Sequence, residues 1–298
     1  MKPALILQQY SWIVNTLLQF GGLTLNELDE KWRLDKIADG NPLPRSTFNR
    51  YRDAIQNMFG IIIECHERTY KYYISNPEVM NGDSIGRWLI NTMSVHGVLA
   101  DSTAISDQLI LENVPVGEHL LPIIIRAIKK RMRLRMGYQK FGAEGYEKVV
   151  CPYGLKLFHQ RWYMLALNDE DQLRIYALDR VTKLERTTKP FRMPKGFSVK
   201  AYFSEYFGVL TNDTPMAHVV IRAHKWAPAY LRTLPLHHSQ RELQSTPDYT
   251  DFAFDLRPTS DFLAQILSQG AGLEVLEPAD LREKMRQSIA ESLKRYEE

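Results

Sequence analysis

Two apolar, aromatic-rich runs on either side of a short polar segment constrain the fold of this 298-residue chain more than any other feature. Residues 161–167 and 173–181 flank residues 168–172, whose Asn and Asp favour a turn, so an antiparallel pair of strands is predicted. In the first strand large apolar side chains lie on both faces, which indicates cover on both sides. In the second strand Arg174 and Tyr176 project from the face opposite the apolar one.

The sequence around this hairpin resembles the WYL domain, which is named for a Trp-Tyr-Leu triplet and folds as an Sm-like β-barrel. The triplet appears here as Trp162-Tyr163-Met164, and Met is close enough to Leu in volume to fill the same core position. An ordered set of further residues makes the match specific: Tyr138 at the end of strand 133–138, residues 152–155 before the next strand, Arg174, and the pair Asp179-Arg180. The resemblance implies an Sm-like barrel over residues 133–195.

Composition and length are those of a globular chain with more than one domain. The hydrophobic fraction of 44% and the charged fraction of 24% exclude disordered, collagenous and coiled-coil classes. The two cysteines, Cys65 and Cys151, are too few and too far apart for a disulfide framework or a CxxC motif, which favours a reducing cytoplasm. The amino terminus is a poor signal peptide, and no apolar run approaches the ~18 residues of a membrane span. A cytoplasmic protein is therefore expected.

Residues 1–78 are predicted to form a winged helix-turn-helix. Helical periodicity stops at Gly21-Gly22, a second helix is capped by Thr24 with Glu27 three residues later, and a third helix starts near residues 44–46. Its polar face carries Arg45, Ser46, Asn49 and Arg50. Such a helix can enter a major groove, where Arg reads guanine and Asn reads adenine. The alternative is an ordinary solvated helix face.

Two short strand patterns follow, at residues 61–66 and 70–74, with Arg68 at the tip between them and Lys71 beside it. A hairpin in this position is typical of a wing that lies along the phosphate backbone. The order of helices and hairpin, and the segment RSTFNRYRDAI in particular, also resembles the winged helix that precedes WYL domains. Arg45, Ser46, Asn49, Arg50, Arg68 and Lys71 are thus the predicted DNA contacts.

Residues 79–132 are predicted to be a helical linker, with periodic segments at 85–92 and 122–132. The second segment leads into the densest basic cluster of the chain, which consists of Arg126, Lys129, Lys130, Arg131, Arg133 and Arg135. This cluster either binds nucleic acid or stabilises the negative end of the helix, as a basic last turn does.

Residues 196–298 show a β-α-β-β-α-β pattern with an added terminal helix, which predicts a ferredoxin-like α/β sandwich. The string GAGLEVLEPADLREKM resembles the carboxy-terminal extension found after WYL domains. The fold class expected for the whole chain is therefore α+β and multidomain.

The sequence shows no convincing catalytic constellation. GxGxxG, P-loop and HExxH patterns do not occur, and the histidines, His237-His238 among them, have no carboxylate or thiol spacing that completes a metal site. We therefore expect no enzyme activity, no cofactor and no metal.

The combined resemblance implies a ligand-responsive transcriptional repressor that binds a palindromic DNA operator as a homodimer. Regulators of this layout include several that control phage-defence loci. An alternative is a single-stranded nucleic-acid-binding accessory protein or a subunit of a nucleic-acid enzyme. A third is a structural scaffold in which the barrel only dimerises.

The resemblance places a ligand pocket at six residues: Tyr138, Tyr153, Arg161, Tyr163, Arg174 and Arg180. Guanidinium groups bind phosphate bidentately and phenol rings stack on bases, so an anionic effector is expected, namely a nucleotide, a cyclic nucleotide or a short single-stranded nucleic acid. The alternatives are that Arg180 pairs with Asp179, that Arg161 is exposed in a turn, and that Tyr163 is a core residue.

Overall fold

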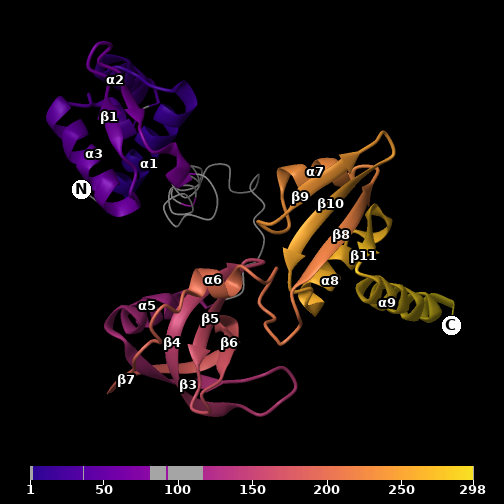
Figure 1. The fold of residues 1–298 in the computed structure, drawn as a ribbon. Helices are drawn as coiled ribbons and strands as arrows, with labels where there is room; N and C mark the ends of the chain where they lie inside the picture. The colour runs from indigo at the N-terminus through magenta and orange to yellow at the C-terminus, as the bar shows by residue number, and fades with distance from the viewer. Residues whose placement is uncertain (1–2, 36, 81–91, 93–116, 298) are drawn as a thin grey trace. The chain divides into compact units, whose positions relative to one another are not determined.

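A computed structural model describes residues 3–35, 37–80, 92 and 117–297, and the chain divides into two compact units, residues 1–112 and 113–298. Each unit is described by itself. The protein is a mixed α/β protein with helices at the amino terminus and several antiparallel sheets (Figure 1). Apart from Thr92, the predicted helical segment 85–92 lies outside the described residues.

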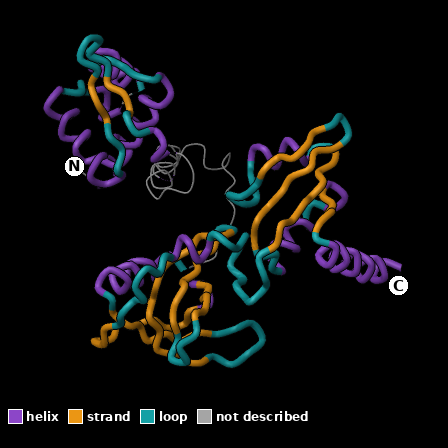
Figure 2. Tube along the Cα trace, in the orientation of Figure 1, coloured by secondary structure: helices purple, strands orange, loops and turns teal. Residues whose placement is uncertain are grey.

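Residues 3–74 of the first unit, of which all but residue 36 are described, form three α-helices followed by a two-stranded hairpin (Figure 2). The predicted capping box is present: the Thr24 amide donates to Glu27 Oε2 at 2.7 Å, and the Glu27 amide donates to Thr24 Oγ1 at 3.3 Å. The bounds are α1 Pro3–Phe20, α2 Leu25–Leu34, α3 Arg45–Phe59, β1 Ile63–Cys65 and β2 Tyr72–Ile74, with 3-10 turns at Ile37–Gly40 and Pro77–Met80. Trp32, Phe48 and Ile55 are buried in one core with side chains of α1 and the hairpin.

The second unit begins with a five-stranded antiparallel sheet in the order β6-β5-β4-β3-β7. Its strands are β3 Met132–Tyr138, β4 Tyr146–Phe158, β5 Arg161–Leu167, β6 Leu173–Ala177 and β7 Val181–Pro190. The 13-residue β4 pairs with β3 through its first part and with β5 through its second.

The closed barrel expected over residues 133–195 is not found. Among the described residues, β6 and β7 are the two edges of the sheet and do not pair with each other. The reason lies in the connection: after the five residues of β6 the chain makes a 3-10 turn at Leu178–Arg180, and β7 then runs along β3. The sheet is therefore open, because no hydrogen bonds join its two edge strands.

Both faces of this sheet are covered, as the two-sided apolar pattern of residues 161–167 predicted. Helix α5, Leu121–Lys130, packs Ile124 and Ala127 against one face, where Met164 and Ala166 are also buried. Leu165 belongs to a separate cluster on the opposite face, together with Phe191. Helix α5 thus shares a core with the sheet although the sequence pattern assigned it to the linker.

A four-stranded antiparallel sheet follows, in the order β11-β8-β10-β9. The predicted β-α-β-β-α-β run and the terminal helix are confirmed: β8 Ala217–His224, α7 Ala227–Thr233, β9 Arg241–Ser245, β10 Tyr249–Leu256, α8 Ser260–Leu267, β11 Leu273–Glu277 and α9 Ala279–Glu297. A short helix before this run, α6 Val199–Phe203, was not predicted. Within the described ranges, no helix has the length and apolar content needed to cross a membrane.

Candidate functional site

The polar face of α3 is exposed because the opposite face is fixed in the core. Phe48, Tyr51, Ile55 and Phe59 are buried, and at 3.6 residues per turn this orientation leaves the other side of the helix in solvent. Arg45, Ser46 and Arg50 are exposed and Asn49 is half-buried. The structure thus brings the four predicted residues together on the first two turns of one helix.

The start of α3 is a region of positive potential. Pro44 occupies the N-cap without a side-chain cap, and the first turn has no acidic residue. The first amide groups of the helix are therefore free to bind an anion. Neither Arg45 nor Arg50 forms an ion pair with any residue that the structure describes, so their charges are not compensated there.

The hairpin packs next to α3, because the rings of Tyr72 and Phe48 meet edge to face at 4.7 Å. Its tip is closed by hydrogen bonds from the His66 amide to the Lys71 carbonyl at 2.9 Å and from the Tyr70 amide to the His66 carbonyl at 2.8 Å. Arg68 and Lys71 are exposed there and form no ion pair within the described part of the chain. All six predicted DNA contacts therefore belong to one unit, on one helix and one adjoining hairpin.

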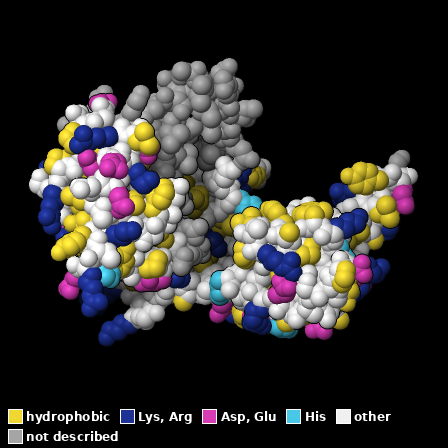
Figure 3. Space-filling model, turned by 90° about the horizontal axis from the view of Figure 1, so that it is seen from above, with side chains coloured by type: hydrophobic (Ala, Val, Ile, Leu, Met, Phe, Trp, Pro, Cys, Tyr) yellow, Lys and Arg dark blue, Asp and Glu magenta, His cyan; other side chains and the backbone are white. Residues whose placement is uncertain are grey.

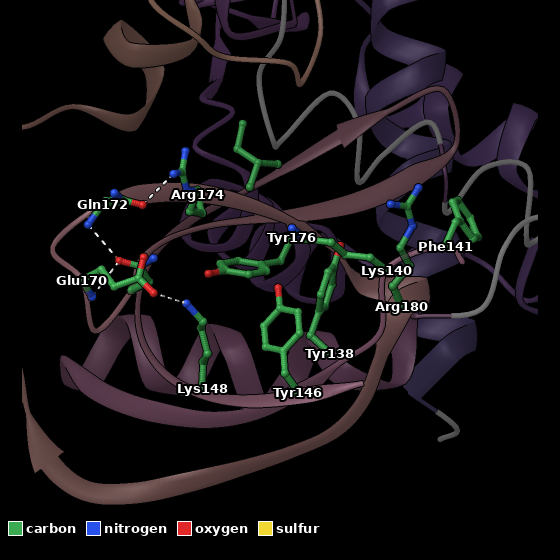
Figure 4. A pocket seen from close by; sticks show the side chains of 12 residues that line it. Tyr138, Lys140, Phe141, Tyr146, Lys148, Glu170, Gln172, Arg174, Tyr176 and Arg180 are labelled. Atoms are coloured by element: carbon green, nitrogen blue, oxygen red, sulfur yellow. Dashed lines mark hydrogen bonds and ion pairs between the residues drawn. The ribbon is translucent and has the colours of Figure 1, made fainter. Parts of the chain in front are cut away.

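A cavity of about 600 Å³ lies at the five-stranded sheet and is lined by residues of β3, the β3–β4 connection, β4, the β5–β6 turn, β6 and the 3-10 turn after it (Figure 4). It contains three of the six predicted ligand residues, Tyr138, Arg174 and Arg180. The complete lining is Tyr138, Lys140, Phe141, Tyr146, Lys148, Asn168, Glu170, Gln172, Arg174, Ile175, Tyr176 and Arg180.

The other three predicted residues do not line this cavity. Tyr153 is buried in the cluster on the opposite face of the sheet, where its ring stacks on Phe191 at 5.9 Å. Tyr163 alternates with Met164 along β5 and so points away from the cavity's face. Arg161 pairs with Asp179 at 3.5 Å, the carboxylate that the sequence alternative had assigned to Arg180.

Three phenol rings form one wall of the cavity. Tyr138 meets Tyr176 edge to face at 5.2 Å and lies 5.9 Å from Tyr146 (Figure 4). Burial raises the pKa of Tyr176 to about 12, and burial also raises the pKa of Tyr138 above its usual value. Tyr138 and Tyr176 are therefore neutral, buried hydrogen-bonding groups at the base of the cavity, and the Tyr146 ring beside them is half-buried.

The cations of the cavity differ in how far they are compensated. Lys148 Nζ pairs with Glu170 Oε1 at 2.7 Å, whereas Arg174 donates from Nη2 to the neutral amide of Gln172 at 2.6 Å. Arg180 lies over the ring of Phe141 at 3.8 Å, and its buried Nε has no hydrogen-bond partner among the described residues. A buried donor without a partner is unfavourable, and an anionic ligand at Arg180 would satisfy it.

Sequence reasoning missed the contribution of β4 and of the β5–β6 turn. Tyr146 and Lys148 lie on alternate positions of β4 with the buried Val150, so strand alternation was a usable signal for them. Glu170 could not be found in this way, because its contact with Lys148 spans 22 residues. In the described ranges no group of three His, Cys, Asp or Glu side chains is arranged to hold a metal ion.

Two domain families match the second unit. The WYL domain family matches residues 119–186, which include α5, the five-stranded sheet up to the first part of β7, and the cavity. This chain contains a WYL domain. The WCX domain family matches residues 215–293, the four-stranded sheet with its helices. We refer to these parts as the WYL domain and the WCX domain.

Two solved structures are similar to this WYL-domain protein at low identity. The Proteasome accessory factor B/C (PafBC) of Arthrobacter aurescens is 19% identical with a TM-score of 0.35, and the match covers 95% of this chain and 46% of that chain. This chain therefore spans under half the length of PafBC. A CRISPR Cas-related protein is 12% identical with a TM-score of 0.41, covering 99% of this chain and 84% of that chain. No curated protein matches the chain.

Proposed function

We propose that this WYL-domain protein is a DNA-binding transcriptional regulator that acts in the cytoplasm and has no catalytic activity. The observation that carries the proposal is the exposed, uncompensated face of α3 with Arg45, Asn49 and Arg50 beside the basic hairpin. An exposed helix with these residues in its first two turns fits a major groove, where Arg reads guanine and Asn reads adenine. Arg68 and Lys71 would contact phosphates.

The architecture supports this assignment. The first unit has the element order of a winged helix-turn-helix, and Leu23 forms a β-bridge with Tyr72 that ties the hairpin to the helices. We assign the WYL domain to an opened Sm-like fold. We assign the WCX domain to a ferredoxin-like sandwich, because its outer strands β11 and β9 flank the central pair β8 and β10.

The regulator would bind a palindromic operator as a homodimer. One recognition helix contacts only a few base pairs, whereas two half-sites about one helical turn apart roughly double the contact energy. We take repression as the sign of regulation and a phage-defence locus as the regulated one, as the family resemblance implies.

The WYL cavity would bind the anionic effector: a nucleotide, a cyclic nucleotide or a short single-stranded nucleic acid. Arg174 and Arg180 are two of its cations without an ion pair among the described residues, and the three phenols would supply surfaces for a base. Binding there would change the affinity of the winged helices for the operator.

The proposal is tested by removing the α3 contacts. We expect Arg45→Ala, Asn49→Ala and Arg50→Ala together to lower operator affinity by about 100-fold or more, because each base contact contributes about 1–3 kcal/mol. Fluorescence anisotropy with the DNA upstream of the protein's own coding sequence measures this. The matched control is Arg282→Ala with Arg286→Ala, which removes the same charge from residues already paired with Glu274 and Glu283. Equal affinity of the α3 variant and the control would contradict the proposal.

A second candidate is a single-stranded nucleic-acid-binding accessory protein. The phenol wall of the cavity favours it, since stacking on bases needs no sequence preference. The two functions differ in which variant abolishes DNA binding: the α3 variant for the regulator, and an Arg174→Ala, Arg180→Ala variant for the accessory protein.

A further inference from the structure

A second basic surface lies on the WYL domain and shares no residue with the lining of the cavity in Figure 4. We call it the cationic ridge and define it as Arg126, Lys129 and Lys130 of α5 with Arg186 of β7. Because Ile124 and Ala127 hold the buried side of α5, the three basic residues of the helix are exposed, and Arg186 is exposed as well.

The strand register brings Arg186 to the helix. Arg186 is directly opposite Leu134, and Leu184 is opposite Met136, so both β7 residues point to the face of the sheet that α5 covers. A cavity of about 390 Å³ separates the two elements, and its lining is Ile123, Arg126, Leu184, Glu185 and Arg186. The ridge therefore flanks a hollow with apolar walls and a guanidinium on each side.

The ridge has no counter-charge among the residues that the structure describes. Helix α5 contains no acidic residue, and Glu185, the one carboxylate at the hollow, pairs with Lys183 at 3.1 Å. In the WCX domain, by contrast, four exposed arginines each pair with a carboxylate at 2.7 or 2.8 Å: Arg232, Arg241, Arg282 and Arg286. The face of the protein in Figure 3 likewise shows Lys and Arg side chains lying among Asp and Glu.

Stabilisation of the helix end explains only part of the ridge. Lys129 and Lys130 are in the last turn of α5, where positive charge is favourable. Arg126 lies before that turn and Arg186 is on a strand, so the helix dipole accounts for neither. These two arginines face a common hollow, which points to a ligand.

We propose that the cationic ridge binds the phosphodiester backbone of nucleic acid. The guanidinium groups of Arg126 and Arg186 match phosphate bidentately, and Ile123 and Leu184 offer apolar contact to a sugar. A membrane surface fits less well, because the apolar side of α5 is already buried in the core of the WYL domain. The proposal rests on the proposed function only in taking nucleic acid as the partner.

The test uses the full chain with α3 silenced by Arg45→Ala, Asn49→Ala and Arg50→Ala. Into this parent we introduce either the ridge variant, Arg126→Ala, Lys129→Ala, Lys130→Ala and Arg186→Ala, or a control of equal charge, Arg232→Ala, Arg241→Ala, Arg282→Ala and Arg286→Ala. Affinity for a random-sequence duplex and for the same sequence as a single strand is measured at several salt concentrations. The slope of log affinity against log salt counts the phosphate contacts.

Each phosphate contact contributes about 0.9 to the slope on the duplex and about 0.7 on the single strand. If all four residues make contacts, the ridge variant should lose about 3.6 in slope on the duplex or about 2.8 on the single strand. The control keeps the parent slope. Loss on the duplex alone assigns the ridge to DNA flanking the operator, and loss on the single strand alone assigns it to an unpaired strand. A ridge variant whose slope equals that of the parent, or of the control, overturns the proposal.

Two additional measurements serve as controls for folding and for charge. Near-UV circular dichroism confirms that the four exposed substitutions leave the fold intact, and Arg126→Lys with Arg186→Lys is expected to retain the slope because the charge is kept. Failure of the proposed function would appear elsewhere, as a missing preference for operator over random DNA in the chain with native α3.

Discussion

The α3 face and the WYL cavity both present arginines, but in opposite surroundings. Arg45 and Arg50 are exposed and form no ion pair among the described residues, whereas Arg174 contacts an amide and Arg180 is half-buried against Phe141. Exposed, uncompensated charges attract an extended polyanion and are screened by salt. Charges held in a walled cavity select a small anion by shape. The comparison therefore separates the surface that we propose reads DNA from the cavity that we propose binds a small ligand.

The largest effect should come from the core beneath α3. Phe48 is fully buried, so Phe48→Ala should lower the free energy of unfolding of the first unit by about 3–5 kcal/mol, much of what a small domain has. Operator binding should disappear above the lowered melting temperature while effector binding persists. Thermal denaturation with each ligand measures both. Met58→Ala, an exposed position of the same helix, is the control. Parallel loss of both activities would mean that the two regions do not act separately.

The second prediction concerns salt concentration, which should change operator affinity far more than effector affinity. A protein making six to ten phosphate contacts loses roughly 10³ to 10⁵ in affinity between about 50 and 200 mM salt. We expect operator affinity to follow that dependence, and effector affinity in the cavity to fall by less than about 10-fold, because fewer charges are involved and they are less screened. Titrations of both ligands across this range provide the comparison. A similar salt dependence of operator affinity and effector affinity would contradict this distinction between the two regions.

The cavity arginines should have the next largest effect. Arg174→Ala with Arg180→Ala should weaken the binding of labelled cyclic dinucleotides or oligonucleotides by about 100-fold, since each charge-assisted hydrogen bond contributes about 1.5–3 kcal/mol. Arg241→Ala with Arg282→Ala removes equal charge from residues paired outside the cavity. Equal effector binding by the two variants would rule out this cavity as the effector site.

The smallest effect concerns the phenol wall. Burial raises the folded-state pKa of Tyr176 from 10.0 to about 12, so the folded protein holds this proton more tightly than the unfolded chain. Its contribution to the free energy of unfolding is therefore fully present below pH 10 and is lost as the pH rises towards about 12. Denaturation across this range should show a decrease of up to about 2.7 kcal/mol in the free energy of unfolding, and Tyr176→Phe should remove this decrease. An identical pH profile for Tyr176→Phe would show that another group causes the decrease.

The sequence predicted local features well where a short segment determines them. The Thr24–Glu27 capping box lies within four residues, and each strand of the WCX domain is a continuous segment of five to eight residues. The open edge of the WYL sheet was not predictable, because pairing between β6 and β7 depends on how a whole domain closes.

The residues of the candidate cavity were also only partly predictable from local sequence. Alternation along β5 places Tyr163 on the face opposite Met164, so the sequence itself argued against the cavity position that family resemblance implied. The Lys148–Glu170 pair joins β4 to the β5–β6 turn, and only the folded sheet brings these residues together. Local pattern therefore identified the strands but not which side chains meet.

Selection of binding sites from a pool of random duplex DNA tests the central claim most directly. The native chain should enrich a common inverted repeat whose half-sites lie about one helical turn apart, and the Arg45→Ala, Asn49→Ala, Arg50→Ala variant should not enrich it. Enrichment of no common sequence by the native chain, or of the same repeat by the variant, would contradict a regulator that reads DNA through α3.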